Sequence, residues 1–298
     1  MITALFKGLL GKGWIVFEFS YLAVAMLALA VIGAAAGVIF ADMTGAPKNV
    51  GTILMMVGIG LLAFYGTALI EKIISLWSFV LYAAYITLFV IAIRELGDEV
   101  VLTAQQQVDI TPDWLSALEY AGINIAAAPA VLFGIAHIKR RKESLWAGAL
   151  AGPIAMIPAL LFYVVLLSQY PQVLGEEVPL ITLLAALHTP VLALVFKIVI
   201  FGTYIETGIA MVHSINERLA GLKRERGGDL SHRQRVACAA VLLVVSIYLA
   251  ASVGLIDLIG KGYGTLTYVI LGVYVLPLLT VGLLQIIRFN DMPHSAGK

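Results

Sequence analysis

The first candidates for chemistry in this chain are polar residues that interrupt long apolar segments. Between 114 and 137 the apolar sequence contains Gly122, Asn124, Pro129 and Gly134. Glycine relaxes a helical backbone, proline removes a backbone donor, and an asparagine side chain both donates and accepts hydrogen bonds. This composition is typical of a discontinuous helix whose unwound backbone coordinates a solute or an ion. The alternative is a proline-kinked helix whose asparagine bonds to a neighbouring helix.

A second group of polar residues lies between 184 and 216. At about 100° per residue of an α-helix, Thr203, Glu206 and His213 share one face. A glutamate and a histidine on one stripe at membrane depth are typical of a proton relay. The alternative places His213 in water at the helix end and pairs Glu206 with another helix.

Two further positions predict local structure. Thr189 and Pro190 predict the start of this helix, with the threonine as N-cap and the proline at the first helical position. Glu18 lies about one turn inside the first apolar segment. For this carboxylate, extension to the aqueous interface is favoured over a functional role.

The sequence has none of the common catalytic motifs. It contains no HExxH, no GxSxG and no P-loop, and the glycine-rich Gly260–Gly264 falls in a short predicted turn. The single cysteine, Cys238, excludes an internal disulfide framework and a cysteine-rich metal cluster. We therefore expect neither an enzyme nor a resident cofactor.

The composition predicts a membrane protein. The chain has 298 residues, of which 61% are apolar and 12% charged, against roughly 45–50% and about 25% in soluble domains. A net charge of +1 gives no reason to expect a nucleic-acid partner. A helix needs roughly 20 apolar residues to cross a bilayer. We predict an all-α integral membrane protein, a single transmembrane domain over 1–298, with eight spans at 14–40, 51–70, 73–93, 114–137, 145–168, 184–216, 234–256 and 265–288.

Charges between the spans predict the orientation. Basic residues gather on one side, at Lys7, Lys12, Lys72, Lys139, Arg140, Arg141, Lys142, Arg218, Lys223, Arg224, Arg226, Arg233, Arg235 and Arg288. The other side is mostly acidic, with Glu95, Asp98, Glu99, Asp109, Asp113, Glu176 and Glu177. Because basic loops stay inside, we expect a multi-pass protein of the cytoplasmic (inner) membrane with both termini in the cytoplasm.

The order of the predicted spans is that of a known transporter architecture. In inverted-repeat transporters of the leucine-transporter type, each repeat has five helices, of which the first is broken and the third is long. The last five spans fit one repeat, beginning with the broken span at 114–137. The first three fit the end of the other repeat, beginning with the long span at 14–40. We therefore predict a bundle of three plus five helices.

Several short motifs add a family resemblance. The segments Ala117–Asn124, Pro129–Leu132, Gly148–Gly152, Leu174–Pro179 and Phe201–Gly208 resemble those of the YkvI-like family of bacterial membrane proteins. This family is a branch of the amino acid/polyamine/organocation transporter superfamily. The resemblance implies a secondary transporter that moves a small organic solute, such as an amino acid or amine.

The resemblance also implies roles for individual residues. The broken helix would bind the solute through Tyr120, Asn124 and the backbone at Gly122. Thr203 and Thr207 would lie where related transporters place hydroxyls for a sodium ion, and with Glu206 they would couple transport to Na⁺ or H⁺.

One difference from the family leaves a second hypothesis open. Family members normally begin with two further helices, whereas Met1–Lys12 here resembles the linker ahead of their third helix. Either this is a natural short form completed by a homodimer or a partner subunit, or the real start lies upstream. The second hypothesis is a non-transporting membrane scaffold or partner subunit.

Overall fold

The chain folds into helices across the residues that the structure describes. The computed structural model describes residues 2–291, apart from 66, 107–112, 127, 129–137 and 139. These described residues form helices, turns and loops, and no strand. Pro129 and Gly134, which support the prediction of a broken helix, lie outside the described residues.

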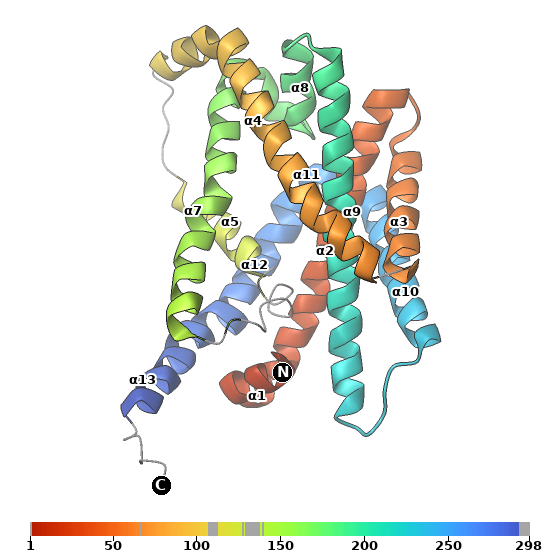
Figure 1. Cartoon of the computed structure of the whole chain (residues 1–298), viewed down its shortest axis with the longest axis vertical. Coiled ribbons are helices and arrows are strands. Elements are labelled where there is room, and N and C mark those ends of the chain that lie inside the picture. Colours follow the sequence, from red (N-terminus) through yellow and green to blue (C-terminus); the bar gives the residue numbers. More distant parts are fainter. Residues whose placement is uncertain are drawn as a thin grey trace.

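The helices follow one another as labelled in Figure 1. At the lower end of that view lie the first helix, the last helix and the α9–α10 turn, with Lys7, Lys223 and Arg226, and we refer to it as the basic end. The bounds are α1 Ile2–Leu10, α2 Trp14–Thr44, α3 Lys48–Tyr65, α4 Thr67–Gln105, α5 Trp114–Ala126, α7 Arg141–Leu166, α8 Pro179–Ala186, α9 Pro190–Arg224, α10 His232–Val253, α11 Leu255–Asp257, α12 Gly264–Ile270 and α13 Leu283–Asp291.

Helices long enough to span a membrane dominate the fold. Six such stretches occur among the described residues: Phe6–Thr44, Phe79–Gln105, Arg141–Gln169, Pro190–Arg224, His232–Val253 and Leu255–Ile287. Large apolar side chains such as Phe79 and Val191 are exposed on them, as expected for surfaces that face lipid. The protein is therefore an all-α multi-pass membrane protein. The predicted span 51–70 corresponds to the shorter apolar helix Lys48–Phe64, and of the span 114–137 the structure describes residues 114–126 and 128.

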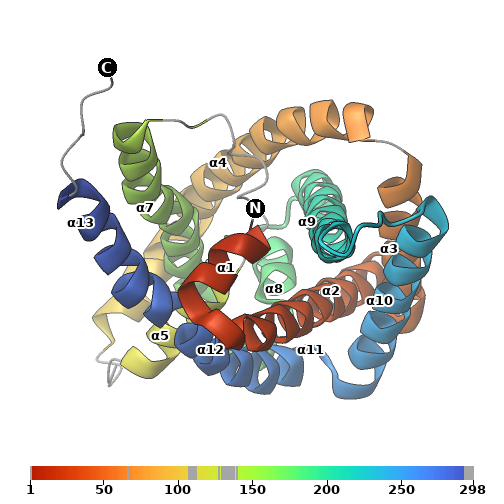
Figure 2. The ribbon, with the colours of Figure 1, turned by 90° about the horizontal axis from the view of Figure 1, so that it is seen from below.

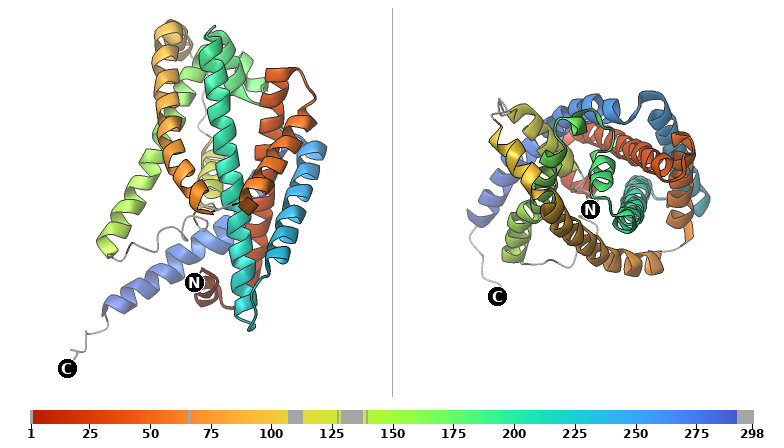
Figure 3. Two further views of the ribbon diagram at one scale, coloured as in Figure 1. Left: turned by 45° about the vertical axis from the view of Figure 1, so that its right-hand side comes forward. Right: turned by 90° about the horizontal axis from the view of Figure 1, so that it is seen from above.

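Helix α2 is the most buried of these elements and packs against α3, α9, α10 and α12 (Figures 2 and 3). Small residues on α2 allow this close approach. A Cβ atom added to Gly37 would lie 2.6 Å from the backbone oxygen of Lys48 on α3. Gly45 ends α2 with a φ of 72°, a left-handed conformation that glycine adopts without strain. The α2–α3 hairpin is therefore tight because its glycines leave room for the neighbouring backbone.

Two predicted boundaries are corrected by the structure. The segment 184–216 is not one helix, because α8 ends at Ala186 and α9 begins at Pro190. Pro190 occupies the first turn as predicted, but the Thr189 hydroxyl is buried without a hydrogen-bond partner and does not cap it. Helix α4 continues beyond 93 to Gln105, because Leu96 is buried on its inner face while Glu95 and Glu99 remain exposed.

Candidate functional site

The three predicted coupling residues lie near the middle of α9. Thr203 Oγ1 donates to the carbonyl oxygen of Val199 at 3.0 Å, and Thr207 Oγ1 donates to that of Thr203 at 2.9 Å. Each hydroxyl thus uses its hydrogen within the helix and keeps oxygen lone pairs, which are the atoms that coordinate a hard cation. Glu206 is half-buried and forms no ion pair with any side chain that the structure describes. This turn of α9 therefore offers uncommitted oxygen ligands.

The face of α9 that carries Glu206 contacts α4 one turn earlier. A Cβ atom added to Gly202 would lie 2.0 Å from the ring of Trp77, so the glycine lets the indole lie against α9. Trp77 Nε1 donates to the carbonyl oxygen of Val199 at 3.3 Å. His213 is exposed and lies nearly two turns from Glu206, about 10 Å along the axis. This distance is therefore too long for direct proton transfer between Glu206 and His213.

The predicted solute-binding residues divide between two faces of α5. Gly122 is buried against α12, where an added Cβ atom would lie 2.5 Å from Thr267 Cγ2. Tyr120 and Asn124 are exposed, and Asn124 Nδ2 donates to the carbonyl oxygen of Tyr120 at 2.7 Å. Gly122 therefore serves helix contact, whereas Tyr120 and Asn124 point away from α12.

The predicted solute set and coupling set lie in different parts of the bundle. Helix α5 packs against α12 and the turn that follows it, whereas α9 packs against α2, α3 and α4. Figure 2 shows α5 beside α12 on one side of α2, and α9 on the other side. Within the described residues, the structure does not bring these two sets together.

A cavity of about 260 Å³, here called the aromatic pocket, lies among helices that sequence reasoning did not connect. Tyr85 of α4 and Phe196 of α9 form one wall, with ring centroids 5.2 Å apart at 90°. Tyr204 of α9 lies next to the Thr203–Thr207 turn and also lines the pocket. The described residues that line it are Val31, Ala35, Tyr85, Phe162, Glu177, Val178, Pro179, Leu180, Phe196, Ile200, Tyr204, Leu255 and Ile259.

The polar groups of the aromatic pocket are few. The hydroxyls of Tyr85 and Tyr204 form no hydrogen bond with described residues. Glu177 is the only fully charged side chain among the lining residues, and its Oε2 accepts from Lys48 Nζ. The volume is below the roughly 300–1,000 Å³ of sites for drug-sized ligands. Aromatic faces and two hydroxyls without a partner among the described residues therefore suit a small solute with an amine group.

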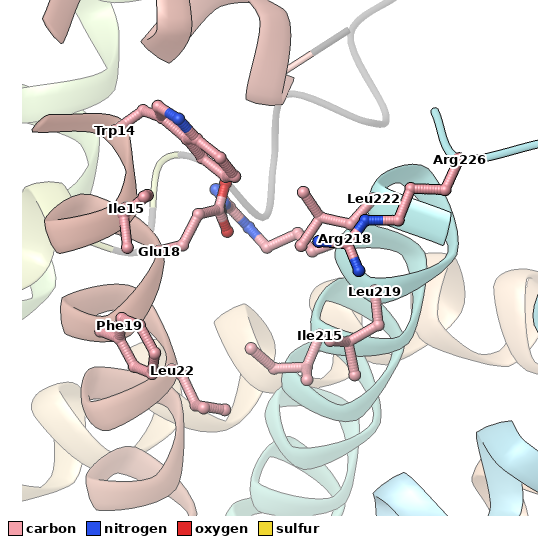
Figure 4. A pocket seen from close by; sticks show the side chains of 10 residues that line it. All are labelled: Trp14, Ile15, Glu18, Phe19, Leu22, Ile215, Arg218, Leu219, Leu222 and Arg226. Carbon is pink, nitrogen blue, oxygen red and sulfur yellow. Dashed lines mark hydrogen bonds and ion pairs between the residues drawn. The ribbon is translucent and has the colours of Figure 1, made fainter. Parts of the chain in front are cut away.

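Sequence reasoning also missed the ion pairs that join α2 to α9. Arg218 Nη1 donates to Glu18 Oε2 at 2.7 Å, and the guanidinium lies 3.9 Å from the ring centroid of Tyr21 (Figure 4 shows Glu18 and Arg218). At the opposite end of the two helices, Lys197 pairs with Asp42. Arg218, predicted to lie between the spans 184–216 and 234–256, is instead part of α9, and Glu18, expected to extend to the aqueous interface, pairs with it.

A periodic signal for Arg218 was present in the sequence. Arg218 continues the buried series Gly208, Met211 and Ile215, whose members are spaced by three or four residues on one face of α9. Its acidic partner lies 200 positions away, however, and no local pattern connects them.

Comparisons with protein-family models, with curated proteins and with solved structures find no match for this chain. The YkvI-like resemblance stays a prediction that rests on the short motifs quoted above.

Proposed function

We propose that the protein is a secondary transporter that moves a small organic solute, an amino acid or amine, across the cytoplasmic membrane. Transport by alternating access would be coupled to Na⁺ or H⁺. In this proposal the basic end and both termini face the cytoplasm. The chain would be a YkvI-like relative with the three-plus-five arrangement of leucine-transporter-type helices.

The aromatic pocket is the observation that carries the proposal. It lies among membrane-spanning helices and holds two tyrosine hydroxyls without a partner in the described chain. Its residue Tyr204 belongs to the same turn of α9 as Thr203, Glu206 and Thr207. A solute site next to uncommitted oxygen ligands is what coupled transport requires, because ion and solute must each affect the binding of the other. Tyr120, Gly122 and Asn124 lie outside this pocket.

Counterflow in proteoliposomes tests the solute site. Vesicles loaded with one unlabelled amine or amino acid should accumulate its radiolabelled form, and a panel of such solutes identifies the preferred one. Tyr204→Phe removes the hydrogen bond that its hydroxyl would make to the solute. Such a bond is worth about 1 kcal/mol, so KM should rise about fivefold. The matched control is Tyr248→Phe on the exposed face of α10, which should leave KM unchanged. Absence of counterflow for every solute, with folded protein in the vesicles, would reject transport.

Glu206→Gln tests coupling separately from solute binding. The variant should lose uphill accumulation driven by an ion gradient and keep counterflow, which needs no gradient. Glu95→Gln, at an exposed position of α4, is the matched control and should retain both activities. Comparing a Na⁺ gradient with a pH gradient in the unaltered protein then identifies the coupling ion.

A scaffold or partner-subunit role is the second candidate, and the exposure of α7 favours it. Only 6% of the most apolar 18-residue stretch of its span Arg141–Gln169 is buried within this chain. Figure 2 shows α7 at the edge of the bundle. Cysteine crosslinking at the exposed positions Leu150 and Ile157 should trap a homodimer or a heteromer if this face meets another protein. A stable complex without solute uptake would favour this role.

A further inference from the structure

A second cavity, here called the α2–α9 groove, lies between the start of α2 and the end of α9. Its volume is about 380 Å³. Six apolar side chains form most of its walls: Ile15, Phe19, Leu22, Ile215, Leu219 and Leu222. Figure 4 shows the charged side chains towards the α9–α10 turn and Phe19, Leu22 and Ile215 further from it. The groove is therefore amphipathic, with its polar end at the basic end of the bundle.

The charges at this polar end leave one positive charge unbalanced. Glu18 and Arg218 neutralise each other through their 2.7 Å contact. The guanidinium of Arg226, which also lines the groove, has no carboxylate partner among the described residues. The nearby Glu225 is already paired with Lys7. A ligand that complements the groove must therefore carry a negative charge next to Arg226.

Two buried guanidinium nitrogens show that the polar end is also incompletely satisfied. Arg218 Nε and Nη2 have no hydrogen-bond partner, and neither has Glu18 Oε1. Burying such groups without partners costs free energy. The Arg218 side chain is only 3% exposed, so these groups are fixed at the polar end of the groove that Arg226 also lines.

The apolar part of the groove opens towards the membrane. Phe19 is 70% exposed although it lies inside a membrane-spanning helix. From Ile15 to Leu22 the apolar wall follows α2 for about 10 Å. Trp14 lines the polar end, and tryptophan is enriched where a span meets the lipid headgroups. This order matches a phospholipid whose charged headgroup lies at the basic end and whose acyl chain extends along the apolar wall.

We propose that the α2–α9 groove binds one anionic phospholipid from the leaflet at the basic end. Arg226 contacts its phosphate, and an acyl chain lies along Phe19, Leu22 and Ile215. Basic pockets between membrane helices bind anionic headgroups through the same combination of charge and apolar wall. The inference concerns a lipid site and does not depend on the proposed transport activity.

Quenching of Trp14 by brominated lipid tests this site. The full-length protein is reconstituted in phosphatidylcholine vesicles with increasing brominated phosphatidylglycerol, and the emission of Trp14→Phe is subtracted to isolate Trp14. Brominated phosphatidylglycerol should quench Trp14 emission at a lower mole fraction than brominated phosphatidylcholine does. Arg226→Gln should raise the required mole fraction about fivefold. Arg233→Gln removes an exposed charge outside the groove and should change nothing.

Three results would overturn the proposal. Equal quenching by both lipids would show that the groove is only an apolar surface without headgroup selectivity. An effect of Arg233→Gln as large as that of Arg226→Gln would show only diffuse electrostatic attraction. Displacement of the brominated lipid by millimolar inorganic phosphate would identify a site for the free anion instead. Native mass spectrometry gives a second readout, in which one retained phosphatidylglycerol should be lost from Arg226→Gln and kept by Arg233→Gln.

Discussion

Replacing Glu18 with glutamine leaves the Arg218 guanidinium without its counter-charge in a buried position. The Arg218 side chain is 3% exposed and that of Glu18 is 13% exposed, so water replaces little of the lost interaction. Removing one partner of a buried ion pair typically costs about 3–5 kcal/mol. At about 1.4 kcal/mol per factor of ten, the lower figure raises the unfolding constant more than one hundredfold.

The ion pair at the opposite end of the same two helices provides the comparison. The Lys197 and Asp42 side chains are 14% and 35% exposed, so solvent screens this pair more strongly. Asp42→Asn should therefore cost about 1 kcal/mol or less. Both variants can be measured by reversible unfolding in mixed micelles of mild detergent and SDS, with helix content as the signal.

A double variant separates the lost attraction from the isolated charge. Replacing Glu18 by glutamine and Arg218 by methionine together removes both charges, and stability should recover by more than half of the single-variant loss. Equal losses for Glu18→Gln and Asp42→Asn, or no recovery in the double variant, would show that burial does not govern the Glu18–Arg218 pair.

Three further outcomes follow from helix contacts and caps. Gly37→Ala should destabilise the protein by about 1–3 kcal/mol, because its Cβ would meet the backbone of α3, whereas Gly58→Ala meets nothing within 4 Å and should be neutral or stabilising in the same unfolding assay. Ser231→Ala removes the capping box of α10 and should cost about 1 kcal/mol, with faster amide exchange in its first turn. Hydrogen bonds from the Ser116 side chain and backbone lower the pKa of Asp113 below its ordinary 3.8. The charged cap is therefore fully present above that value and is lost as the pH falls through the lower folded-state pKa, so amide exchange in the first turn of α5 should accelerate as the pH is lowered below 3.8.

Apolar length and proline position were enough to predict much of the fold. The all-α membrane class and the start of α9 at Pro190 follow from patterns within a few turns of chain. The end of α4 was missed, because the predicted span was ended at 93, ahead of the charged residues, although Leu96 continues the buried face. The separate helix α8 ahead of that start was missed, and the φ of 49° at His188 between the two helices is not signalled by its sequence neighbours.

The candidate sites were harder to predict, because they depend on pairing between distant helices. Thr203 and Glu206 could be assigned to one helix from spacing alone. The aromatic pocket combines Tyr85 of α4 with Tyr204 of α9, and helix periodicity does not specify which faces meet. Arg218 was placed between two spans because of its charge. In the structure it is buried in α9, where the desolvation cost of its guanidinium is offset by Glu18 and the aromatic ring of Tyr21.

The two ion pairs between α2 and α9 also restrict how the molecule can move. Glu18 and Asp42 are 24 positions apart on α2 and hold α9 at both ends, a separation of about 36 Å along the axis. Sliding one helix past the other by a single turn, about 5.4 Å, would separate both pairs at once. The register of α2 against α9 is therefore held chiefly by the buried Glu18–Arg218 pair, and the Lys197–Asp42 pair adds a smaller contribution. We therefore expect a rearrangement that changes access to the aromatic pocket in the helices around this pair, foremost in α7, which is the least buried span.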